Sequence, residues 1–507
     1  MAEAHMSGGT LGKSTSPVSV LALDLGASSG RAIVGTYDKE SGLTLSEVHR
    51  FDNGAVPGSS PMQWDLAHLV EELKTGIAHA CSVASIKSVA IDTWGVDFGL
   101  LDAEGAPVAN PVHYRDARTD GMAARLQHEG SLDGVYAVTG TQTMDINTLF
   151  QLIALKRDEP HVADRAERLL FMPDLLAYCL TGNGGCDPSI ASTSQLVDAR
   201  TGTWSPEVVG RFDIPKSWLP PITPEGTVIG NTLPGIAPYP IPVVRVCGHD
   251  TASAVASIPL GAEDCFISCG TWSLVGAVLD APVLTPEAEA LNITNELGAQ
   301  GKTLLLENCT GLWIAQELRR ELMAAYGAAP SWIDIARLAS SAKPFACLID
   351  TEAPEFAKPG SMRDRIASFA YKTGQPAPAH DDIGALYRCI YESLALRYRR
   401  AIAEVERLTG KTYRSIHVIG GGAQNRCLCQ TIADITQLPV VAGPFEATAI
   451  GNILVQLVAA GVSADLDEAR ASIAVDVEQI DYVPGAAPSQ EVLDRYESLG
   501  EAGRMDA

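Results

Sequence analysis

The sequence has few basic residues for its length. Its 507 residues include 37 lysines and arginines against 61 aspartates and glutamates, a formal net charge of −24. Phosphate backbones and anionic lipid surfaces repel so acidic a chain, which argues against nucleic acid and membrane as partners. A small phosphate-bearing ligand must therefore be held by local groups that act against this overall charge.

Long hydrophobic runs are also missing. The longest apolar stretches, such as 450–460, are shorter than the about 20 residues of a membrane-spanning helix. The first residues lack the basic region and apolar core of a secretory signal, so we expect 1–16 to be a disordered leader or tag. Eleven cysteines follow no metal-ligand spacing, which favours a reduced, cytoplasmic protein without disulfides.

The composition that remains is that of an ordinary globular protein, with 46% hydrophobic and 19% charged residues. A chain of this length is too long for one hydrophobic core, so at least two domains are expected. We place the boundary near 259–262, which gives domains over 17–259 and 260–485 and a C-terminal tail over 486–507.

An internal repeat supports this division. In the first half, strands are predicted over 18–23, 30–37 and 43–51, then a helix capped by Asp65, and then strands over 86–91, 95–101 and 243–247. In the second half, strands over 265–268 and 274–279 flank a turn of small residues, and a helix over 385–408 ending at Gly410 precedes a strand over 415–419. A repeat at this spacing predicts two similar domains that face each other.

The stretch Asp24–Arg31 interrupts the first two strands with more residues than a hairpin needs. A wide turn rich in Gly, Ala and Ser lets several backbone N–H groups converge on a phosphate, and Asp24 suits a hydrated Mg²⁺. The alternative is a plain wide hairpin with an aspartate at its turn. A similar turn at 270–273 would face the first one across the domain interface and hold the same phosphate chain.

Two further glycine-containing junctions follow strands. Gly420–Gly422 comes between a strand and a helix, and it either accommodates a flat ring such as adenine or allows tight strand–helix packing. Asp250, in "GHDTAS", is either a helix N-cap or a general base acting on a substrate hydroxyl, and His249 is assigned a positioning role. Gly451 is expected to let two helices pack closely.

Polar residues also interrupt apolar segments at 91–98, 114–120 and 307–317. A sugar needs such a ring of donors and acceptors beside an aromatic wall. For Arg115, Asp116 and Arg118 the alternative is an ion-pair network.

Eight segments in this order resemble the FGGY family of carbohydrate kinases, within the actin-like ATPase superfamily. The resemblance runs from about Val18 to Pro484. It implies an α/β fold of two ribonuclease-H-like (actin-like ATPase) domains with an interdomain catalytic cleft. Cys269 stands where the family pattern has serine, which we expect to leave the turn intact. The segments are "DLGASSGR", "IDTWGVDF", "YRDART", "HDTASAV", "SCGTWSL", "NITNE", "GLW" and "GGGAQN".

The resemblance also implies site residues. Asp250 is the proton acceptor, and Asp24 lies near Mg²⁺, in contact through water. Contacts to ATP are implied for Ala27, Ser28, Ser29, Gly30, Arg31, Thr271, Gln316 and Gly421. Contacts to the sugar are implied for Gly95, His249, Asp250, Thr251 and Asn308.

The implied reaction transfers the γ-phosphoryl group of MgATP to the C1 hydroxyl of L-rhamnulose. A kinase for another ketose, such as L-fuculose or L-xylulose, is the nearest alternative. These sugars differ in the stereochemistry of their hydroxyl groups, and an enzyme can discriminate one hydroxyl by a single contact. A non-metabolic actin-like ATPase would have the two turns but would not need the "HDTAS" segment. A sugar-binding regulator has no reason to keep Asp24 and Asp250. We expect a monomer or a weak homo-oligomer.

Overall fold

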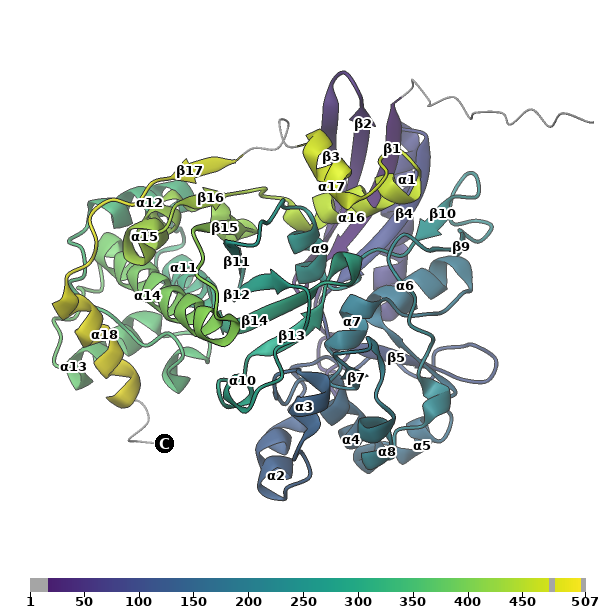
Figure 1. Cartoon of the computed structure of the whole chain (residues 1–507), viewed down its shortest axis with the longest axis horizontal. Coiled ribbons are helices and arrows are strands. Elements are labelled where there is room, and N and C mark those ends of the chain that lie inside the picture. Colours follow the sequence, from purple (N-terminus) through teal and green to yellow (C-terminus); the bar gives the residue numbers. More distant parts are fainter. Residues whose placement is uncertain (1–16, 474–478, 503–507) are drawn as a thin grey trace, which may run out of the picture.

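The computed structural model describes residues 17–473 and 479–502, so the predicted leader at 1–16 lies outside the described residues. Two mixed β-sheets, one of six strands and one of seven, form the centres of the N-terminal and C-terminal halves. In Figure 1 the purple and teal strands of the first sheet stand beside the green and yellow elements of the second half. This arrangement confirms the predicted α/β class with two sheet-containing halves.

The N-terminal sheet follows the predicted order of three strands, a helix and a strand. β1 pairs antiparallel with β2 and parallel with β4, while β2 pairs antiparallel with β3. Helix α1 (Leu66–Val83) begins after Asp65, whose carboxylate accepts the N–H of His68 as an N-cap. The strand order is β3 (Gly42–Asp52), β2 (Ser29–Asp38), β1 (Val18–Leu25), β4 (Ile86–Thr93), β10 (Pro242–Val244) and β9 (Val228–Asn231).

The C-terminal sheet repeats this plan. β11 pairs antiparallel with β12 and parallel with β15, as β1 does with β2 and β4. The long helix α14 (Ile383–Thr409) is capped by Gly410 in the left-handed conformation at φ 66°, as predicted. The strand order is β13 (Thr294–Leu297), β14 (Thr303–Thr310), β12 (Trp272–Leu279), β11 (Asp264–Cys269), β15 (Ser415–Ile419), β16 (Val440–Ala442) and β17 (Ile480–Tyr482).

Two predicted strands are shorter than expected. The stretch over 95–101 is extended only as β5 (Phe98–Leu101), which pairs with β6 (Arg168–Phe171) in a small separate sheet. Val96 adopts a left-handed φ of 65°, so the chain turns there before it extends. The strand predicted over 243–247 is β10, which ends at Val244.

The two halves interlock through helix α16 (Ala447–Ala459), which packs on β1, β4 and helix α9 (Asp250–Ala256) of the first half. A Cβ on Gly451 would lie 1.8 Å from the carbonyl oxygen of Ser253, so only glycine permits this approach. The prediction that Gly451 allows close helix packing is confirmed. The yellow α16 and α17 lie beside the purple strands of the first half (Figure 1).

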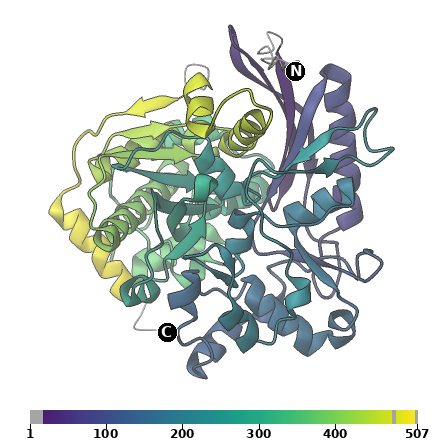
Figure 2. The same ribbon diagram turned by 45° about the vertical axis from the view of Figure 1, so that its right-hand side comes forward.

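The remaining elements surround the sheets, and Figure 2 shows the first half from another side. No described helix is both long and apolar enough to cross a membrane. Between β4 and β10 the chain forms α2 (Met122–His128), α3 (Val135–Thr139), α4 (Thr148–Asp158), α5 (Pro160–Ala163), α6 (Met172–Thr181), α7 (Pro188–Ser192), α8 (Pro206–Arg211), β7 (Val197–Asp198) and β8 (Thr203–Trp204). The second half adds α10 (Pro286–Ala290), α11 (Trp313–Tyr326), α12 (Trp332–Ser341), α13 (Met362–Lys372), α15 (Arg426–Thr436), α17 (Leu466–Ile473) and α18 (Gln490–Ala502).

Candidate active site in the interdomain cleft

A cavity of about 690 Å³ lies between the two halves, where the β1–β2 and β11–β12 turns meet. Nine of the predicted site residues line it, whereas Asp24, Ser29, Gly30, Arg31 and Gly421 do not. The nine come from both halves, so the fold brings together residues that lie up to 289 positions apart (316 − 27). They are Ala27, Ser28, Gly95, His249, Asp250, Thr251, Thr271, Asn308 and Gln316.

The first turn is shorter than predicted. The β1–β2 ladder continues to the pairs Asp24↔Arg31 and Leu25↔Gly30, so only residues 26–29 form the turn between the paired strands. The predicted extent of the turn, over Asp24–Arg31, is therefore wrong. The turn is narrower than predicted because Asp24 and Arg31 lie opposite each other on the two strands and form an ion pair.

The charged pair beside this turn is well defined. Arg31 donates to Asp24 Oδ2 at 2.6 Å and also pairs with Glu446, which precedes α16. Burial raises the pKa of Asp24, and the guanidinium of Arg31 acts against this shift. Gly30 has a packing reason to be glycine, since a Cβ there would overlap the ring of Phe51. The turn itself presents only the small residues of 26–28 to the cavity.

The second turn carries neutral groups. Thr271 Oγ1 donates to Gln316 Oε1 at 3.1 Å, which joins the turn to helix α11. Behind the turn, the hydroxyl groups of Ser273 and Tyr398 lie 2.7 Å apart, and Cys269 is fully buried beside them. The backbone of this turn is thus supported by neutral hydrogen bonds.

The glycine triplet has a clear packing role. Cβ atoms on Gly420 and Gly422 would approach Cys269, at 3.1 Å from its carbonyl oxygen and 2.2 Å from its Sγ. Gly420 lines the cavity, whereas Gly421 has open space around it. Tight packing therefore explains Gly420 and Gly422, and a nucleotide contact at Gly421 stays a prediction.

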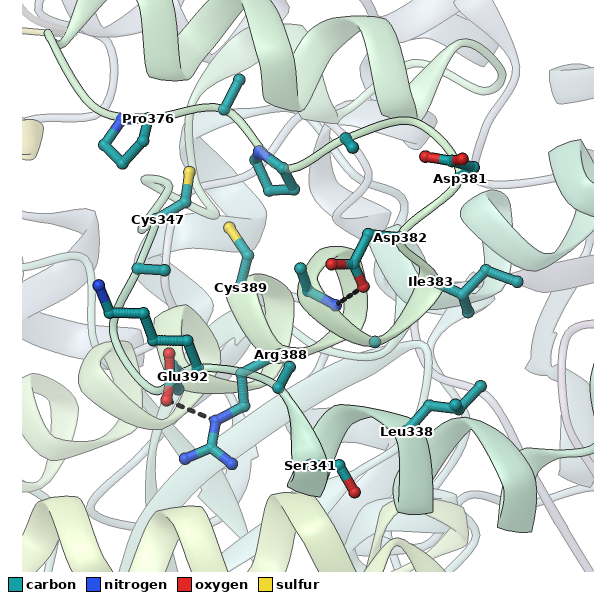
Figure 3. A pocket seen from close by; sticks show the side chains of 18 residues that line it. Leu338, Ser341, Cys347, Pro376, Asp381, Asp382, Ile383, Arg388, Cys389 and Glu392 are labelled. Carbon is teal, nitrogen blue, oxygen red and sulfur yellow. Dashed lines mark hydrogen bonds and ion pairs between the residues drawn. The ribbon is translucent and has the colours of Figure 1, made fainter.

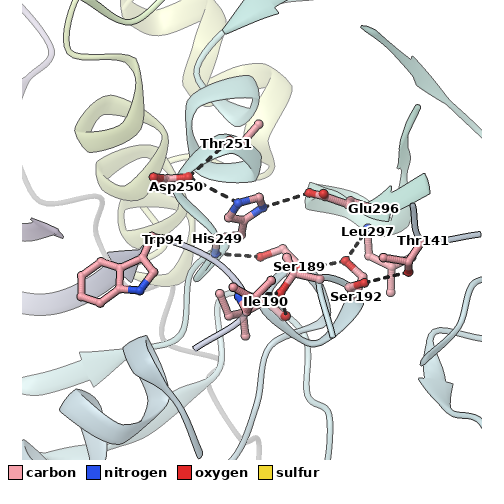
Figure 4. Close-up of polar contacts among 12 residues, drawn as sticks. Trp94, Thr141, Ser189, Ile190, Ser192, His249, Asp250, Thr251, Glu296 and Leu297 are labelled. Carbon is pink, nitrogen blue, oxygen red and sulfur yellow. Dashed lines mark hydrogen bonds and ion pairs between the residues drawn. The ribbon is translucent and has the colours of Figure 1, made fainter. Parts of the chain in front are cut away.

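Asp250 is not the N-cap of its helix. His249 occupies the N-cap position of α9, without a side-chain capping bond, and Asp250 is the first helical residue. The Asp250 carboxylate accepts the hydroxyl of Thr251 at 3.3 Å and borders the cavity (Figure 4). Burial raises the pKa of Asp250, and the nearby His249 opposes this shift. The capping interpretation is wrong, and the carboxylate remains available to a ligand.

His249 lies between two carboxylates. Its Nε2 is 3.4 Å from Asp250 Oδ1, and its Nδ1 is 3.0 Å from Glu296 Oε2 of β13 in the opposite half. Burial acts to lower the pKa of His249, but the carboxylates of Glu296 and Asp250 outweigh it and raise the pKa to about 9. The imidazole is therefore positively charged at neutral pH. We did not predict Glu296, whose only signal was the "NITNE" segment.

The aromatic wall of the cavity depends on Asp97. Its buried carboxylate accepts the indole N–H groups of Trp64 at 2.6 Å and Trp94 at 3.0 Å, and the backbone N–H of Tyr114. Burial raises the pKa of Asp97 to about 6, against these hydrogen bonds. Trp94 and Tyr114 line the cavity, whereas Asp97 supports them from behind.

The two arginines of the 114–120 segment, Arg115 and Arg118, have different roles. Arg118 is buried and lies 3.7 Å from Glu159, so the ion-pair interpretation holds for it. Arg115 instead lines the cavity and lies over the rings of Tyr114 and Trp313, the latter from the opposite half. Arg320, which carried no sequence signal, also lines the cavity.

A second cavity, of about 650 Å³, lies within the C-terminal half (Figure 3). It is bordered by α12 and the start of α14, and its walls include Cys347, Cys389 and the ion pair of Arg388 with Glu392. None of the predicted site residues lines it. All eleven cysteines of the chain are free thiols.

Two mixed sheets that repeat one plan, each with a hairpin turn at a shared polar cleft, match the two-domain actin-like architecture that the sequence predicts. The chain belongs to the FGGY family of carbohydrate kinases, whose N-terminal domain matches residues 19–257 and whose C-terminal domain matches residues 265–460. Similar proteins include the rhamnulokinase of Bacteroides thetaiotaomicron, 40% identical and covering 91% of this chain and 95% of the relative. The rhamnulokinase of Pectobacterium atrosepticum is also 40% identical, over 92% of this chain and 93% of the relative.

Solved structures show the same fold. A ligand-bound xylulose kinase from Lactobacillus acidophilus superposes with a TM-score of 0.76 at 15% identity, covering 96% of each chain. Glycerol kinase from Plasmodium falciparum with ADP gives a TM-score of 0.75 at 15% identity, over 96% of this chain and 98% of that one. The actin-like fold inferred from the sequence is confirmed.

Proposed function

We propose that this chain transfers the γ-phosphoryl group of ATP to the C1 hydroxyl of L-rhamnulose, giving L-rhamnulose 1-phosphate and ADP. The observation that carries the proposal is the carboxylate of Asp250, which is 34% exposed on the wall of a polar cleft between two hairpin turns. The substrate comes from the relatives named rhamnulokinase, which align over about nine-tenths of the chain.

In this proposal Asp250 is the general base. As the acceptor oxygen bonds to phosphorus and the bond from phosphorus to the ADP oxygen breaks, the hydroxyl proton moves to the carboxylate. The base must be ionised, and the positive charge of His249 favours that form. Gly95, Thr251 and Asn308 would hold the sugar, because they line the cavity around Asp250.

The nucleotide would lie across both turns. Ala27 and Ser28 offer backbone and hydroxyl groups from the first turn, and Thr271 with Gln316 offers polar groups from the second. Phosphoryl transfer mainly requires positioning and charge stabilisation, which two opposed turns can provide. Roles in nucleotide binding for Ser29, Gly30, Arg31 and Gly421 are also proposed, although these residues lie outside the cavity lining.

Magnesium is implied by the family, and the residues beside the first turn fit it. Asp24 is adjacent to Asp92 on the parallel strand β4, and Oδ1 of Asp92 is buried without a hydrogen-bond partner in the part of the chain that the structure describes. In proteins Mg²⁺ keeps several waters and is held by one or two carboxylates together with phosphate oxygens. Asp24 would hold it through water, and the ion, when bound, supplies positive charge to the phosphate chain.

We further propose that the protein acts in the cytoplasm as a monomer or weak homo-oligomer. When the two halves close on the substrates, the cleft excludes the water that would otherwise accept the phosphoryl group.

The test is ADP release from MgATP by purified protein with L-rhamnulose, L-fuculose, L-xylulose, D-xylulose, glycerol and no sugar. We expect turnover with L-rhamnulose to exceed all others. Preference for another sugar would keep the mechanism and change the substrate. Equal hydrolysis with every sugar and with none would identify an actin-like ATPase instead.

A further inference from the structure

The segment 292–297 of the C-terminal half is docked on the N-terminal half. The side-chain oxygen of Asn292 accepts the N–H of Thr143 at 2.8 Å, and the N–H of Leu297 donates to Ser192 Oγ at 2.9 Å. Both contacts join residues more than 100 positions apart in the sequence. They fix β13 against the wall of the cleft, although none of its residues has a part in the proposed reaction.

Glu296 is the charged residue of this docked strand that reaches the base. Its Oε2 lies 3.0 Å from His249 Nδ1, with the Glu296 side chain only 8% exposed. The opposite ring nitrogen, Nε2, faces Asp250 Oδ1 at 3.4 Å. A row of carboxylate, imidazole and carboxylate therefore crosses from one half to the other, as Figure 4 shows.

We propose that Glu296 is a positioning residue: it holds His249 as an imidazolium whose Nε2 proton faces Asp250, so that the C-terminal half orients the base of the N-terminal half. The consequence for catalysis rests on the proposed function, whereas the contact between Glu296 and His249 is independent of it.

The chemistry follows from the two ring nitrogens. Neutral imidazole carries one N–H, so it can donate toward one carboxylate only, whereas imidazolium donates toward both. The charged groups that face His249 are Glu296 from β13, Asp250 from its own helix and Asp187, which caps α7. The backbone N–H of His249 donates to Ser189 Oγ at 3.1 Å, which fixes the main chain. The ring itself is held by charge, because its contacts with Glu296 and Asp250 are ion pairs and its Nδ1 makes no hydrogen bond among the described residues.

The first test is the titration of His249 in the ligand-free protein, followed by imidazole NMR and assigned by comparison with His249→Gln. In Glu296→Gln we expect the midpoint to fall by about 1–3 pH units, the shift typical of one opposite charge within 4–6 Å. Glu289→Gln is the matched control, because Glu289 is exposed on helix α10, which precedes β13, and its loss should leave the titration unchanged. Glu296→Asp serves as the second variant if Glu296→Gln does not fold.

Kinetics give the second readout. Glu296→Gln should lower kcat by about 10- to 100-fold, the loss typical of partners that orient metal-ligating histidines, with the KM for ATP unchanged. An unchanged His249 titration would overturn the proposal. So would a raised KM for the sugar with normal kcat, which would make Glu296 a sugar ligand. A shifted titration in a protein that phosphorylates no sugar would support the contact and refute the proposed function.

Discussion

The two turns that face the cleft share a topology and differ in chemistry. In both, an antiparallel pair of strands is joined by a turn of small residues, and the first strand of the pair has a parallel neighbour on its other side. The first turn is flanked by the ion pair of Arg31 with Asp24. The second is supported by the neutral contact of Ser273 with Tyr398.

This difference shows how one repeated unit can serve two purposes. The N-terminal half concentrates charge at the cleft wall and behind it, because Asp250 lines the cavity while Asp24 and Asp92 lie behind it, close enough for the three to affect one another's pKa values. The C-terminal half offers mainly uncharged donors and acceptors around Thr271, with Glu296 and Arg320 as its charged contributions. We therefore expect that removing a charged group from the first half reduces activity or stability more than removing a hydrogen bond from the second half does.

The largest effect is expected for Asp250→Asn. The variant should lose about 10²–10⁴-fold in kcat, the usual contribution of a general base, while the KM for the sugar changes little. Because the pKa of Asp250 is raised, wild-type kcat/KM should fall as the pH drops toward a midpoint above the ordinary aspartate range, and the variant should lack this limb. Steady-state ADP release measures both. Activity within a few-fold of wild type would refute the assignment.

The next largest effect, a loss of stability, is expected for Arg31→Gln, because this variant leaves Asp24 buried without its cation. Removing one partner of a buried ion pair costs about 3–5 kcal/mol, and we expect about 3 because Arg31 is 24% exposed. Urea denaturation at pH 7 gives the free energy of unfolding. Arg50→Gln is the matched control on the neighbouring strand. Its pair with Glu47 is half-exposed and should contribute less than about 1 kcal/mol. Equal losses in the two variants would contradict the contrast.

In the second half, Tyr398→Phe should cost only about 1–1.5 kcal/mol, since it removes one neutral buried hydrogen bond to Ser273. Tyr482→Phe is the comparison, because the Tyr482 hydroxyl is buried in the same half and has no hydrogen-bond partner among the described residues, so its removal should be nearly neutral. The same denaturation experiment applies. A loss at Tyr398 as large as that at Arg31 would remove the distinction between the two turns.

The smallest effect is expected for Thr271→Ala. Losing the partly buried bond to Gln316 should weaken ATP binding by about 0.5–1 kcal/mol, or about 2- to 5-fold in KM, with kcat nearly unchanged. Initial rates at varied ATP concentration measure it. An unchanged KM would show that the nucleotide does not contact this turn.

Much of the fold could be predicted because local sequence patterns determine where strands and helices begin and end. The buried run of β1, the cap at Asp65 and the left-handed Gly410 each depend on a few neighbouring residues. The errors occurred where pairing between strands decides. The first turn looked wide in sequence because a run of small residues separates Asp24 from Arg31, yet Asp24 pairs with Arg31 and Leu25 with Gly30 across the ladder.

The candidate site was predicted unevenly for the same reason. Asp250 carries a recognisable local motif, and its partly exposed carboxylate borders the cleft. Asp97 has an equally polar motif but supports two tryptophans from behind. Only the packing of the aromatic wall distinguishes a residue that faces a ligand from one that holds the wall.

The sequence by itself determined the two repeated sheets and the positions of the turns between their first strands, because hydrophobic period and small residues at strand ends fix local geometry. Pairing between strands decided how wide the first turn is. Tertiary structure alone decided which side chains meet across the cleft. Glu296 reaches His249 and Glu446 reaches Arg31 only because one half is docked on the other. Contacts between such distant residues depend on how whole sheets and helices pack, and no local pattern in the chain encodes that.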